Sequence, residues 1–467
     1  MSPLSRHSKP DGASPPGTAR DVALAALSDR AGNVTAHLNR LLAQAHLAPQ
    51  EAALARELAL GVVRRQRTLD AVLAAFQRHG SPYPARIRSI LRLGAYQLLF
   101  LQRVPDFAAV NEAVKQVGAG AGLRGFVNAL LRNIARSASE AQPGPVEPAR
   151  DVLPLEAGAF RRFDRPMFPN PATAPAGYLA LAYSLPDELA EKWLGDLGGL
   201  DAAARIAAHA NARPPLVLRV NSLRATVPQV LQRLADASIE AVAHRNGLSV
   251  VVTGRADPSR LEVFTEGLVQ PQDAAATSVV AACPVKPGMR VLDLCAAPGT
   301  KTTHLAERMG DRGEILAVDV SDEKLTRIQE SCRRMGLSII RTALAPEIAA
   351  QAETPFKLVL VDAPCSNTGV LARRPEARWR FSRDNLSALV NDQRHLLLLG
   401  AQLVAPGGVC VYSTCSLENQ ENQQVVQYVL SRRSDLELRT ERVISPAGAD
   451  NPAEWSDGGY FALLRRV

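Results

Sequence analysis

The chain has 467 residues, enough for several domains, and a formal net charge of +8 at neutral pH. Hydrophobic residues make up 46% and charged residues 21%, which excludes a collagen-like chain and argues against wholesale disorder. Six cysteines are too few for a disulfide scaffold, and no apolar run approaches the roughly 18 residues of a membrane helix. The first twenty residues also lack the apolar core of a signal peptide, so we expect a soluble cytoplasmic protein without a membrane segment.

The amino-terminal part is basic and has a helical pattern. Residues 1–18 are rich in Pro, Ser and Gly and predict a disordered tail. Over residues 19–137 apolar residues recur at helical spacing without sustained strand-like alternation, which predicts an all-α bundle. This region holds 16 basic and 7 acidic side chains, which leaves the rest of the chain nearly neutral. A solvated arginine-rich surface would explain the excess, but a nucleic-acid partner explains it better.

Three further regions follow along the chain. Residues 138–175 contain eight prolines and predict a linker. Residues 176–269 mix helical patterns with short strands near 216–220 and 248–252, which predicts a small α+β module. Residues 270–467 alternate buried strands with helices, which predicts a doubly wound, mostly parallel α/β sheet. The four expected strands are Arg290–Leu294, Glu314–Val320, Lys357–Asp362 and Gly407–Ser413.

The first of these strands runs into a tight turn of small residues, Cys295–Lys301, and then a helix. Such a turn brings backbone N–H groups close to a ligand at the carboxyl end of the strand. It matches neither GxGxxG nor GxxxxGK[ST], which disfavours a dinucleotide or a nucleoside triphosphate. The second strand ends at Asp319, 20 residues after Gly299, where a carboxylate can accept hydrogen bonds from both ribose hydroxyls of an adenosine cofactor. The alternative, a helix N-cap, is less favoured beside this turn.

Thiols follow the next two strands. Asp362 and Cys365 come after one strand and Cys415 after the other, so both sulfurs should face the same crevice. A thiolate that adds to carbon 6 of a pyrimidine makes carbon 5 nucleophilic enough to take a methyl group from a sulfonium donor. An acid bonded to N3 and the exocyclic amine of cytosine would stabilise this adduct, and a second thiol could assist its release. From the residues alone, either Cys365 or Cys415 is a candidate nucleophile.

Free cysteines are usually small buried hydrophobic residues. We interpret Cys283, Cys332 and Cys410 in this way. Cys295 also follows a strand, but the packing of its turn explains it adequately.

Several segments closely resemble the RNA cytosine-5 methyltransferases, specifically the family of ribosomal small-subunit RNA methyltransferase B, also called Sun or Fmu. They are DLCAAPGTKTTH (293–304), VDAPCSNTGV (361–370) and YSTCSLENQENQ (412–423). The helical region resembles a NusB-type RNA-binding domain through LRLGAYQLLFL (91–101) and GFVNALLRNIAR (125–136). The resemblance implies a multidomain chain whose carboxyl-terminal domain is a Rossmann-like class I methyltransferase.

The resemblance also implies roles for individual residues. Cys415 matches the family's nucleophile, Cys365 the thiol that promotes product release, and Asp362 would lie between cofactor and base. DNA cytosine methyltransferases instead use the cysteine of a Pro-Cys pair, which here would be Cys365. The residues that would hold S-adenosylmethionine are Cys295, Ala296, Ala297, Pro298, Gly299, Thr300, Lys301, Asp319 and Asp362. The implied enzyme needs no metal and acts as a monomer on 16S ribosomal RNA, free or in an assembly intermediate.

One position departs from the family pattern. The family usually carries a Gly-Asp pair at the end of the third strand, whereas residues 339–344 contain no acid, so we expect no carboxylate contact to the adenine there. This departure weakly favours a non-catalytic RNA-binding or assembly factor, whereas the two intact cysteine motifs favour an enzyme. A DNA methyltransferase is disfavoured because no second recognition domain follows the catalytic one. The segment Asp457–Phe461 matches the family's closing strand and is expected to be structural.

Overall fold

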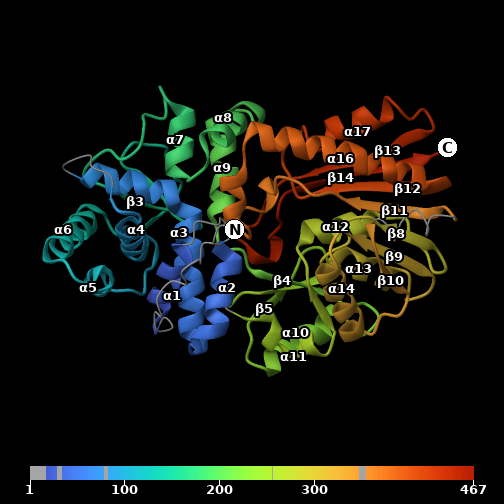
Figure 1. Ribbon diagram of the computed structural model, residues 1–467, viewed down its shortest axis with the longest axis horizontal. Coiled ribbons are helices and arrows are strands. Elements are labelled where there is room, and N and C mark those ends of the chain that lie inside the picture. Colours follow the sequence, from blue (N-terminus) through green and yellow to red (C-terminus); the bar gives the residue numbers. More distant parts are fainter. Residues whose placement is uncertain (1–16, 29–33, 78–82, 255, 346–353) are drawn as a thin grey trace, which may run out of the picture. The chain divides into compact units, whose positions relative to one another are not determined.

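The computed structural model describes residues 17–28, 34–77, 83–254, 256–345 and 354–467. Residues 1–16 of the predicted tail therefore lie outside the described residues. The chain divides into two compact units, one formed by Met1–Leu155 with Ala159–Leu185 and the other by Glu156–Gly158 with Pro186–Val467 (Figure 1). None of the helices in the described parts of the chain combines the length and apolarity that a membrane span requires.

Amphipathic helices build most of the first unit. In α6 the buried side chains Val127, Leu130, Leu131 and Ile134 follow the i, i+3, i+4, i+7 spacing of one helical face. Residues 17–137 contain no strand where they are described, as the predicted all-α bundle requires. The helices are α1 (Ala19–Leu27), α2 (Val34–Ala45), α3 (Pro49–Phe76), α4 (Ala85–Phe100), α5 (Asp106–Val117), α6 (Ala121–Ser137) and α7 (Pro175–Ala182).

The segment predicted as a linker contains a small antiparallel sheet in the order β1-β3-β2. Its strands are β1 (Gln142–Pro143), β2 (Val152–Pro154) and β3 (Ala159–Arg162). The prolines that suggested a linker are compatible with this sheet, because Pro143 lies in an edge strand and Pro154 ends the other edge strand. Val152 and Leu153 are buried, so this part of the chain packs rather than merely connects.

The second unit begins with α8 (Asp187–Asp196) and α9 (Leu200–Asn211), followed by a four-stranded antiparallel sheet in the order β5-β6-β4-β7. Strands β4 and β6 are the two that the sequence predicted. The last strand of this sheet runs past the predicted module boundary at residue 269. Its elements are β4 (Leu216–Val220), α10 (Val227–Asp236), β5 (Ala241–Ala243), β6 (Ser249–Val252), α11 (Glu262–Thr265) and β7 (Val269–Pro271).

A seven-stranded sheet in the order β10-β9-β8-β11-β12-β14-β13 forms the rest of this unit. The first five strands in that order are parallel, and β14 pairs antiparallel with both β12 and β13. The strands are β8 (Arg290–Asp293), β9 (Glu314–Asp319), β10 (Ile340–Leu344), β11 (Phe356–Asp362), β12 (Val404–Thr414), β13 (Leu436–Ile444) and β14 (Gly459–Arg466). All four predicted strands are present, with ends that differ by a few residues.

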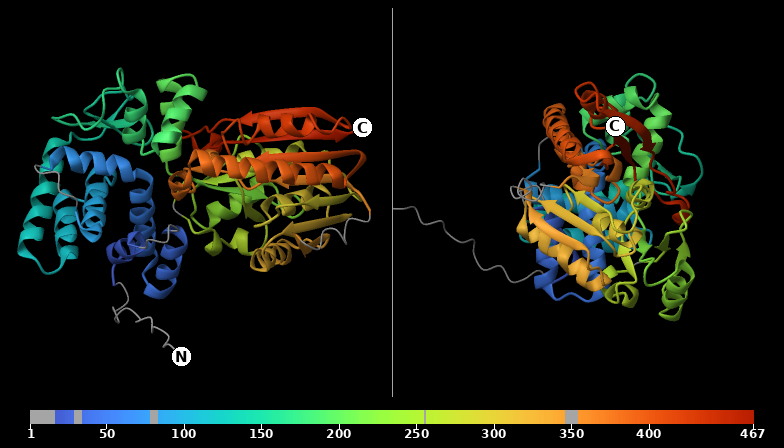
Figure 2. Two further views of the ribbon diagram at one scale, coloured as in Figure 1. Left: turned by 45° about the horizontal axis from the view of Figure 1, so that its top comes forward. Right: turned by 90° about the vertical axis from the view of Figure 1, so that its right-hand side faces the viewer.

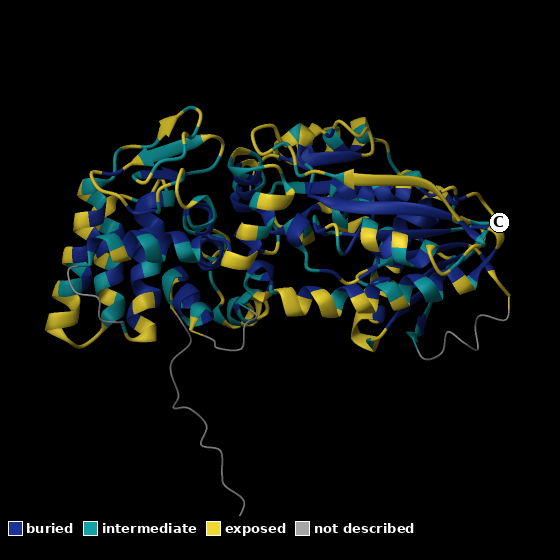
Figure 3. Cartoon of the chain, turned by 90° about the horizontal axis from the view of Figure 1, so that it is seen from above, coloured by how far each residue is buried: buried dark blue, intermediate teal, exposed yellow. Residues whose placement is uncertain are grey.

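Helices cover both faces of this sheet (Figure 2). Side chains alternate along β11, so that Leu358 and Leu360 pack under one helical layer whereas Val359 and Val361 pack under the other. The first layer is α12 (Ala274–Ala282), α13 (Thr300–Arg308) and α14 (Asp322–Met335), and the second is α16 (Arg383–Leu403) and α17 (Gln423–Leu430). The central strands are buried while edge strand β13 is mostly exposed (Figure 3). The fold is therefore doubly wound, and the turns after β8, β9, β11 and β12 lie at one edge of the sheet.

Candidate active site

Two loops that carry cysteines leave the sheet side by side. Strands β11 and β12 are parallel neighbours, and their register pairs Asp362 with Ser413. The loop after β11 contains Cys365 and the loop after β12 begins with Cys415. The structure brings the two sulfur atoms to 3.1 Å, which is hydrogen-bond distance for thiols.

The two thiols have different electrostatic surroundings. The hydrogen bond from Cys365 lowers the pKa of Cys415, and the positive charges of Lys301 and Arg374 act in the same direction. The hydrogen bond to Cys415 raises the pKa of Cys365 well above its ordinary value, as do burial and the negative charge of Glu421. These opposite directions favour Cys415 as the sulfur that ionises and Cys365 as the thiol that then donates to it.

The remaining cysteines have no such activation. Burial raises the pKa of Cys283, Cys295 and Cys410 to about 12 and that of Cys332 to about 11. These four thiols stay neutral, which matches their interpretation as packing residues.

An ion pair lies next to the cysteines. Lys301 Nζ is 2.7 Å from Asp362 Oδ2, and the Ser413 hydroxyl donates to Asp362 Oδ1 at 2.7 Å. Burial by itself would lower the pKa of Lys301, but the charge of Asp362 and its hydrogen bond outweigh burial and raise it. Sequence reasoning placed Lys301 only with the cofactor turn, whereas the structure directs its ammonium to Asp362 and towards Cys415.

The turn after β8 is held by backbone hydrogen bonds and by Asp319. The N–H of Ala297 donates to Asp319 Oδ2 at 3.2 Å, and the N–H of Val320 donates to Oδ1 at 2.8 Å. Gly299 has φ +92°, a left-handed conformation that favours glycine, and a Cβ built on it would lie in tight contact with Ile328 Cγ1 at 3.0 Å. The N-cap residue of α14 is Ser321, so the alternative role of Asp319 as N-cap is not realised.

These residues fit an adenosine cofactor. Asp319 is a buried carboxylate at the end of β9 that is fixed by two backbone donors and retains lone pairs for ribose hydroxyls. The small side chains of Cys295–Gly299 keep the backbone open to a ligand. Strand β10 contains no acidic residue, as the sequence indicated.

A cavity of about 50 Å³ opens beside Cys415. Asp457 and Lys301, the latter in the first turn of α13, also line it, so the ion pair of Lys301 and the sulfur of Cys415 border the same cavity. Asp457 is buried against Arg373, whose Nε donates to Oδ2 at 2.6 Å, and burial raises the pKa of Asp457 to about 7. The segment expected to be structural therefore also forms a wall of the cavity. The described residues contain no cluster of three or more His, Cys, Asp or Glu side chains that could hold a metal ion.

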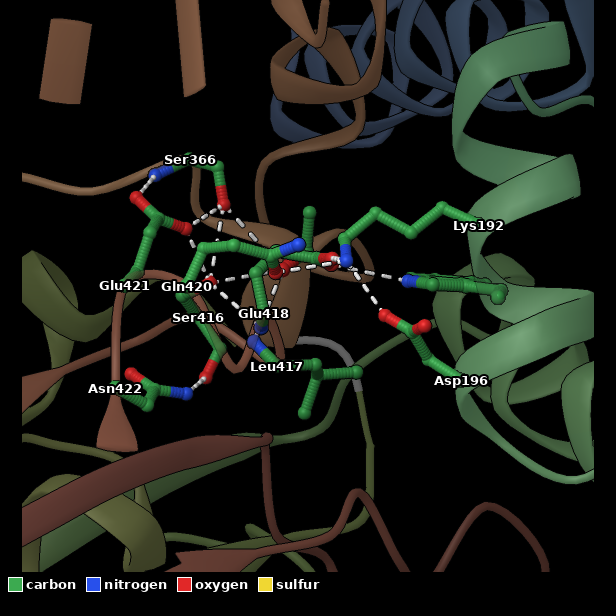
Figure 4. A network of polar contacts seen from close by, with 11 residues as sticks. Lys192, Asp196, Ser366, Ser416, Leu417, Glu418, Gln420, Glu421 and Asn422 are labelled. Atoms are coloured by element: carbon green, nitrogen blue, oxygen red, sulfur yellow. Dashed lines mark hydrogen bonds and ion pairs between the residues drawn. The ribbon is translucent and has the colours of Figure 1, made fainter. Parts of the chain in front are cut away.

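Sequence reasoning missed several polar neighbours of the cysteines. Asn367 has φ +62°, and its Oδ1 accepts from Cys415 Sγ at 3.4 Å and from Arg374 Nη1 at 3.2 Å. Two buried carboxylates, Glu418 and Glu421, lie in the loop after Cys415 (Figure 4). The only signal for these residues was their position inside the two cysteine-bearing motifs.

Glu418 ties the Cys415 loop to α8. Its side chain accepts a hydrogen bond from Trp193 Nε1 at 3.1 Å and lies 3.4 Å from Lys192 Nζ. Lys192 also reaches Asp196 and Gln420, so the contacts form a connected network (Figure 4).

A mostly parallel sheet with a small-residue turn after β8 and a buried acid at the end of β9 is the architecture of an S-adenosylmethionine-dependent methyltransferase. Residues 281–458 match the family described as 16S rRNA methyltransferase RsmB/F. Residues 18–136 match the NusB family, and residues 185–255 match the ferredoxin-like domain of RsmF/B-like methyltransferases. The chain belongs to the RsmB/F family of 16S rRNA methyltransferases, and its cofactor is S-adenosylmethionine.

Known relatives cover nearly the whole chain. A probable ribosomal RNA small subunit methyltransferase B from Synechocystis is 33% identical over 96% of this chain and 100% of its own length. A ribosomal RNA small subunit methyltransferase B from Vibrio cholerae is 32% identical over 91% of this chain and 92% of its own. Among solved structures, a methyltransferase homologue from Pyrococcus horikoshii has a TM-score of 0.54 and 26% identity, over 63% of this chain and 100% of its own. These matches confirm the family resemblance and the NusB-like domain.

Proposed function

We propose that this protein methylates carbon 5 of a cytosine in small-subunit ribosomal RNA through a covalent bond between Cys415 and carbon 6. The observation that carries the proposal is the Cys365–Cys415 pair, 3.1 Å apart beside the Lys301–Asp362 ion pair. The names of the relatives, ribosomal RNA small subunit methyltransferase B, support the substrate class.

In the first step the Cys415 thiolate attacks carbon 6, and the π electrons of the ring move towards carbon 5. Lys301 and Arg374 favour the thiolate form of Cys415. Lys301 and Ser413 fix the carboxylate of Asp362, which can accept a hydrogen bond from the exocyclic amine of the base. The adjacent ammonium of Lys301 can donate a proton to N3. This contact offsets the charge that builds up on the ring as the adduct forms.

When bound, S-adenosylmethionine supplies the methyl group at this edge of the sheet. Afterwards a base, a water molecule at the site, takes the proton of carbon 5. The electron pair of that C–H bond re-forms the double bond between carbons 5 and 6, and the bond from carbon 6 to sulfur breaks. Cys415 departs as a thiolate, and the Cys365 thiol donates a hydrogen bond to it at that moment. This arrangement assigns the two sulfurs different steps and favours Cys415 over Cys365 as nucleophile.

The target base must be unstacked to reach a half-buried sulfur, which favours a loop in free RNA or in an assembly intermediate. We further propose that the protein is a monomer and that it acts in the cytoplasm. The excess of basic side chains over residues 19–137 supports an RNA contact on that domain.

Bisulfite sequencing of 16S ribosomal RNA tests the function directly. We compare cells that contain the protein, cells that lack it, and cells that carry Cys415→Ala. The expected result is one protected cytosine that disappears in the second and third samples. Retention of the mark with Cys415→Ala would contradict the mechanism, and an identical pattern in all three would contradict the substrate.

A further inference from the structure

Glu421 lies six residues after Cys415, immediately before Asn422 and α17, and its side chain is buried. Its carboxylate is satisfied by four donors. Oε1 accepts from the backbone N–H of Ser366 at 2.8 Å and from Gln393 Nε2 at 2.9 Å. Oε2 accepts from the hydroxyls of Ser366 and Ser416 (Figure 4). A buried carboxylate is costly to desolvate, so this arrangement is maintained against a free-energy penalty.

Three of the four donors come from the two loops that carry the cysteines, and the fourth, Gln393, belongs to α16. Ser366 directly follows Cys365, and Ser416 directly follows Cys415. One carboxylate therefore joins the residues adjacent to both sulfurs, across 50 residues of sequence. A carboxylate accepts hydrogen bonds only, so it can satisfy four donors at once, which an amide cannot do.

Glu421 is itself fixed to the strand that leads to Cys415. Its backbone oxygen accepts from the hydroxyl of Tyr412 on β12 at 2.6 Å. The next residue, Asn422, accepts from the Thr414 hydroxyl at 2.6 Å and donates to the Ser416 carbonyl at 3.0 Å. The carboxylate is thus held in place relative to β12, and its hydrogen bonds from Ser366 hold the Cys365 loop against the same strand.

We propose that Glu421 is a positioning residue that clamps the two cysteine loops together, so that the Cys365 thiol stays against the Cys415 sulfur when the product leaves. This inference rests on the two-cysteine mechanism proposed above. Glu421 touches neither substrate nor cofactor in this role and positions the two sulfurs through Ser366 and Ser416.

The charge of Glu421 supports the same division of roles. Its negative charge contributes to the raised pKa of Cys365, which keeps that residue protonated as a donor. The positive charges of Lys301 and Arg374 act instead to lower the pKa of Cys415.

The test uses Glu421→Ala in the full-length protein. In single-turnover reactions with substrate RNA and S-adenosylmethionine, we measure the lifetime of the covalent protein–RNA adduct on denaturing gels. Without RNA, we measure the rate at which diamide oxidises Cys365 and Cys415 to a disulfide, by mass spectrometry of the peptides. Because small misplacements of reacting groups cost one to two orders of magnitude, we expect the adduct to live about tenfold longer and the disulfide to form about tenfold more slowly.

The matched control is Glu307→Gln. Glu307 is another buried carboxylate; it lies in α13 and pairs with Arg219 of β4. The control variant should lower the thermal midpoint without changing either rate, which separates positioning from general destabilisation. If Glu421→Ala does not fold, the double variant Ser366→Ala/Ser416→Ala keeps the carboxylate, removes both hydroxyl links and is expected to slow oxidation and release in the same direction.

A folded Glu421→Ala or double variant with wild-type oxidation and adduct lifetimes would overturn the inference. Slower disulfide formation in Glu421→Ala would support the clamp. If at the same time no covalent RNA adduct formed in the wild type or in any variant, including Cys365→Ala, the covalent mechanism would be contradicted. The two proposals therefore fail in different measurements.

Discussion

The Sγ atoms of Cys365 and Cys415 lie 3.1 Å apart although 50 residues separate them in the sequence. Parallel pairing of β11 with β12 creates this proximity, because both loops start from the same edge of the sheet. Lys301 and Arg374 act on one sulfur and Glu421 on the other, so the pKa values of two chemically identical side chains shift in opposite directions. This asymmetry leads to the predictions below.

Cys365→Ala should form the covalent RNA adduct but release it slowly. The departing Cys415 thiolate loses a hydrogen bond, and a bond to a charged group is worth about 1.5–3 kcal/mol, or roughly 10- to 150-fold in rate. A denaturing gel of protein incubated with RNA and cofactor should show a slowly migrating band. Cys410→Ala, which removes a buried thiol outside the cavity, serves as control, and absence of the band in Cys365→Ala would contradict the release role.

Lys301→Gln should move the titration of Cys415 to higher pH. Removing a nearby positive charge makes the thiolate less favourable, so the pKa of Cys415 rises and less thiolate is present at a given pH. The measurement is the rate of iodoacetamide labelling of Cys415 against pH in the free protein. Lys324→Gln, which removes a lysine near Asp319, should leave the profile unchanged, and an unshifted profile in Lys301→Gln would refute the assignment.

Gly369→Ala should destabilise the protein and slow methylation. A Cβ at this position would lie 2.4 Å from the Gly458 carbonyl oxygen and 2.9 Å from that of Cys415, so backbone must move. We expect a loss of about 1–3 kcal/mol in the free energy of unfolding, measured by urea denaturation. Gly195→Ala in α8, where a Cβ has open space, is the control, and equal stability of the two variants would show that the Cys415 loop accommodates the extra atom freely.

Asp293→Asn should change the pH dependence of stability. Burial raises the pKa of Asp293 to about 7, whereas an unfolded aspartate titrates near 4. Between these values the unfolded chain loses its proton while the folded chain keeps it, so this residue reduces stability as the pH rises from about 4 to 7. The variant has no titrating carboxyl at this position. Its free energy of unfolding should therefore rise relative to that of the wild type between pH 4 and 7, by up to about 4 kcal/mol.

Thermal unfolding of both proteins from pH 4 to 8 measures this gain. Other titrating groups are shared by the two proteins and cancel in the difference. Parallel stability curves would mean that Asp293 is already ionised in the folded protein.

The sequence predicted the central sheet because its strands are continuous apolar runs, as in Val359–Val361. It did not reveal β13, since that strand is an edge with seven consecutive exposed residues and therefore has no apolar run. It also misjudged residues 138–175, because prolines at sheet edges look the same as prolines in a linker.

Part of the candidate site could also be predicted from the sequence, because it follows from the pattern of strands. Residues at strand ends, such as Asp319 and Asp362, can be placed from the order of the strands alone. The Glu421 clamp and the partner of Lys301 depend on how two loops fold over each other, which no local pattern encodes. Those residues became visible only when their hydrogen bonds could be assigned.

The contact of Glu418 with Trp193 and Lys192 has a practical consequence for anyone who wishes to work with a shorter enzyme. A fragment that starts at Gln270 would contain all strands of the seven-stranded sheet and both thiols, yet it would leave the buried carboxylate of Glu418 without its α8 partners. The smallest self-sufficient catalyst should therefore begin near Pro186, with α8 serving as an outer brace that belongs to the catalytic machinery.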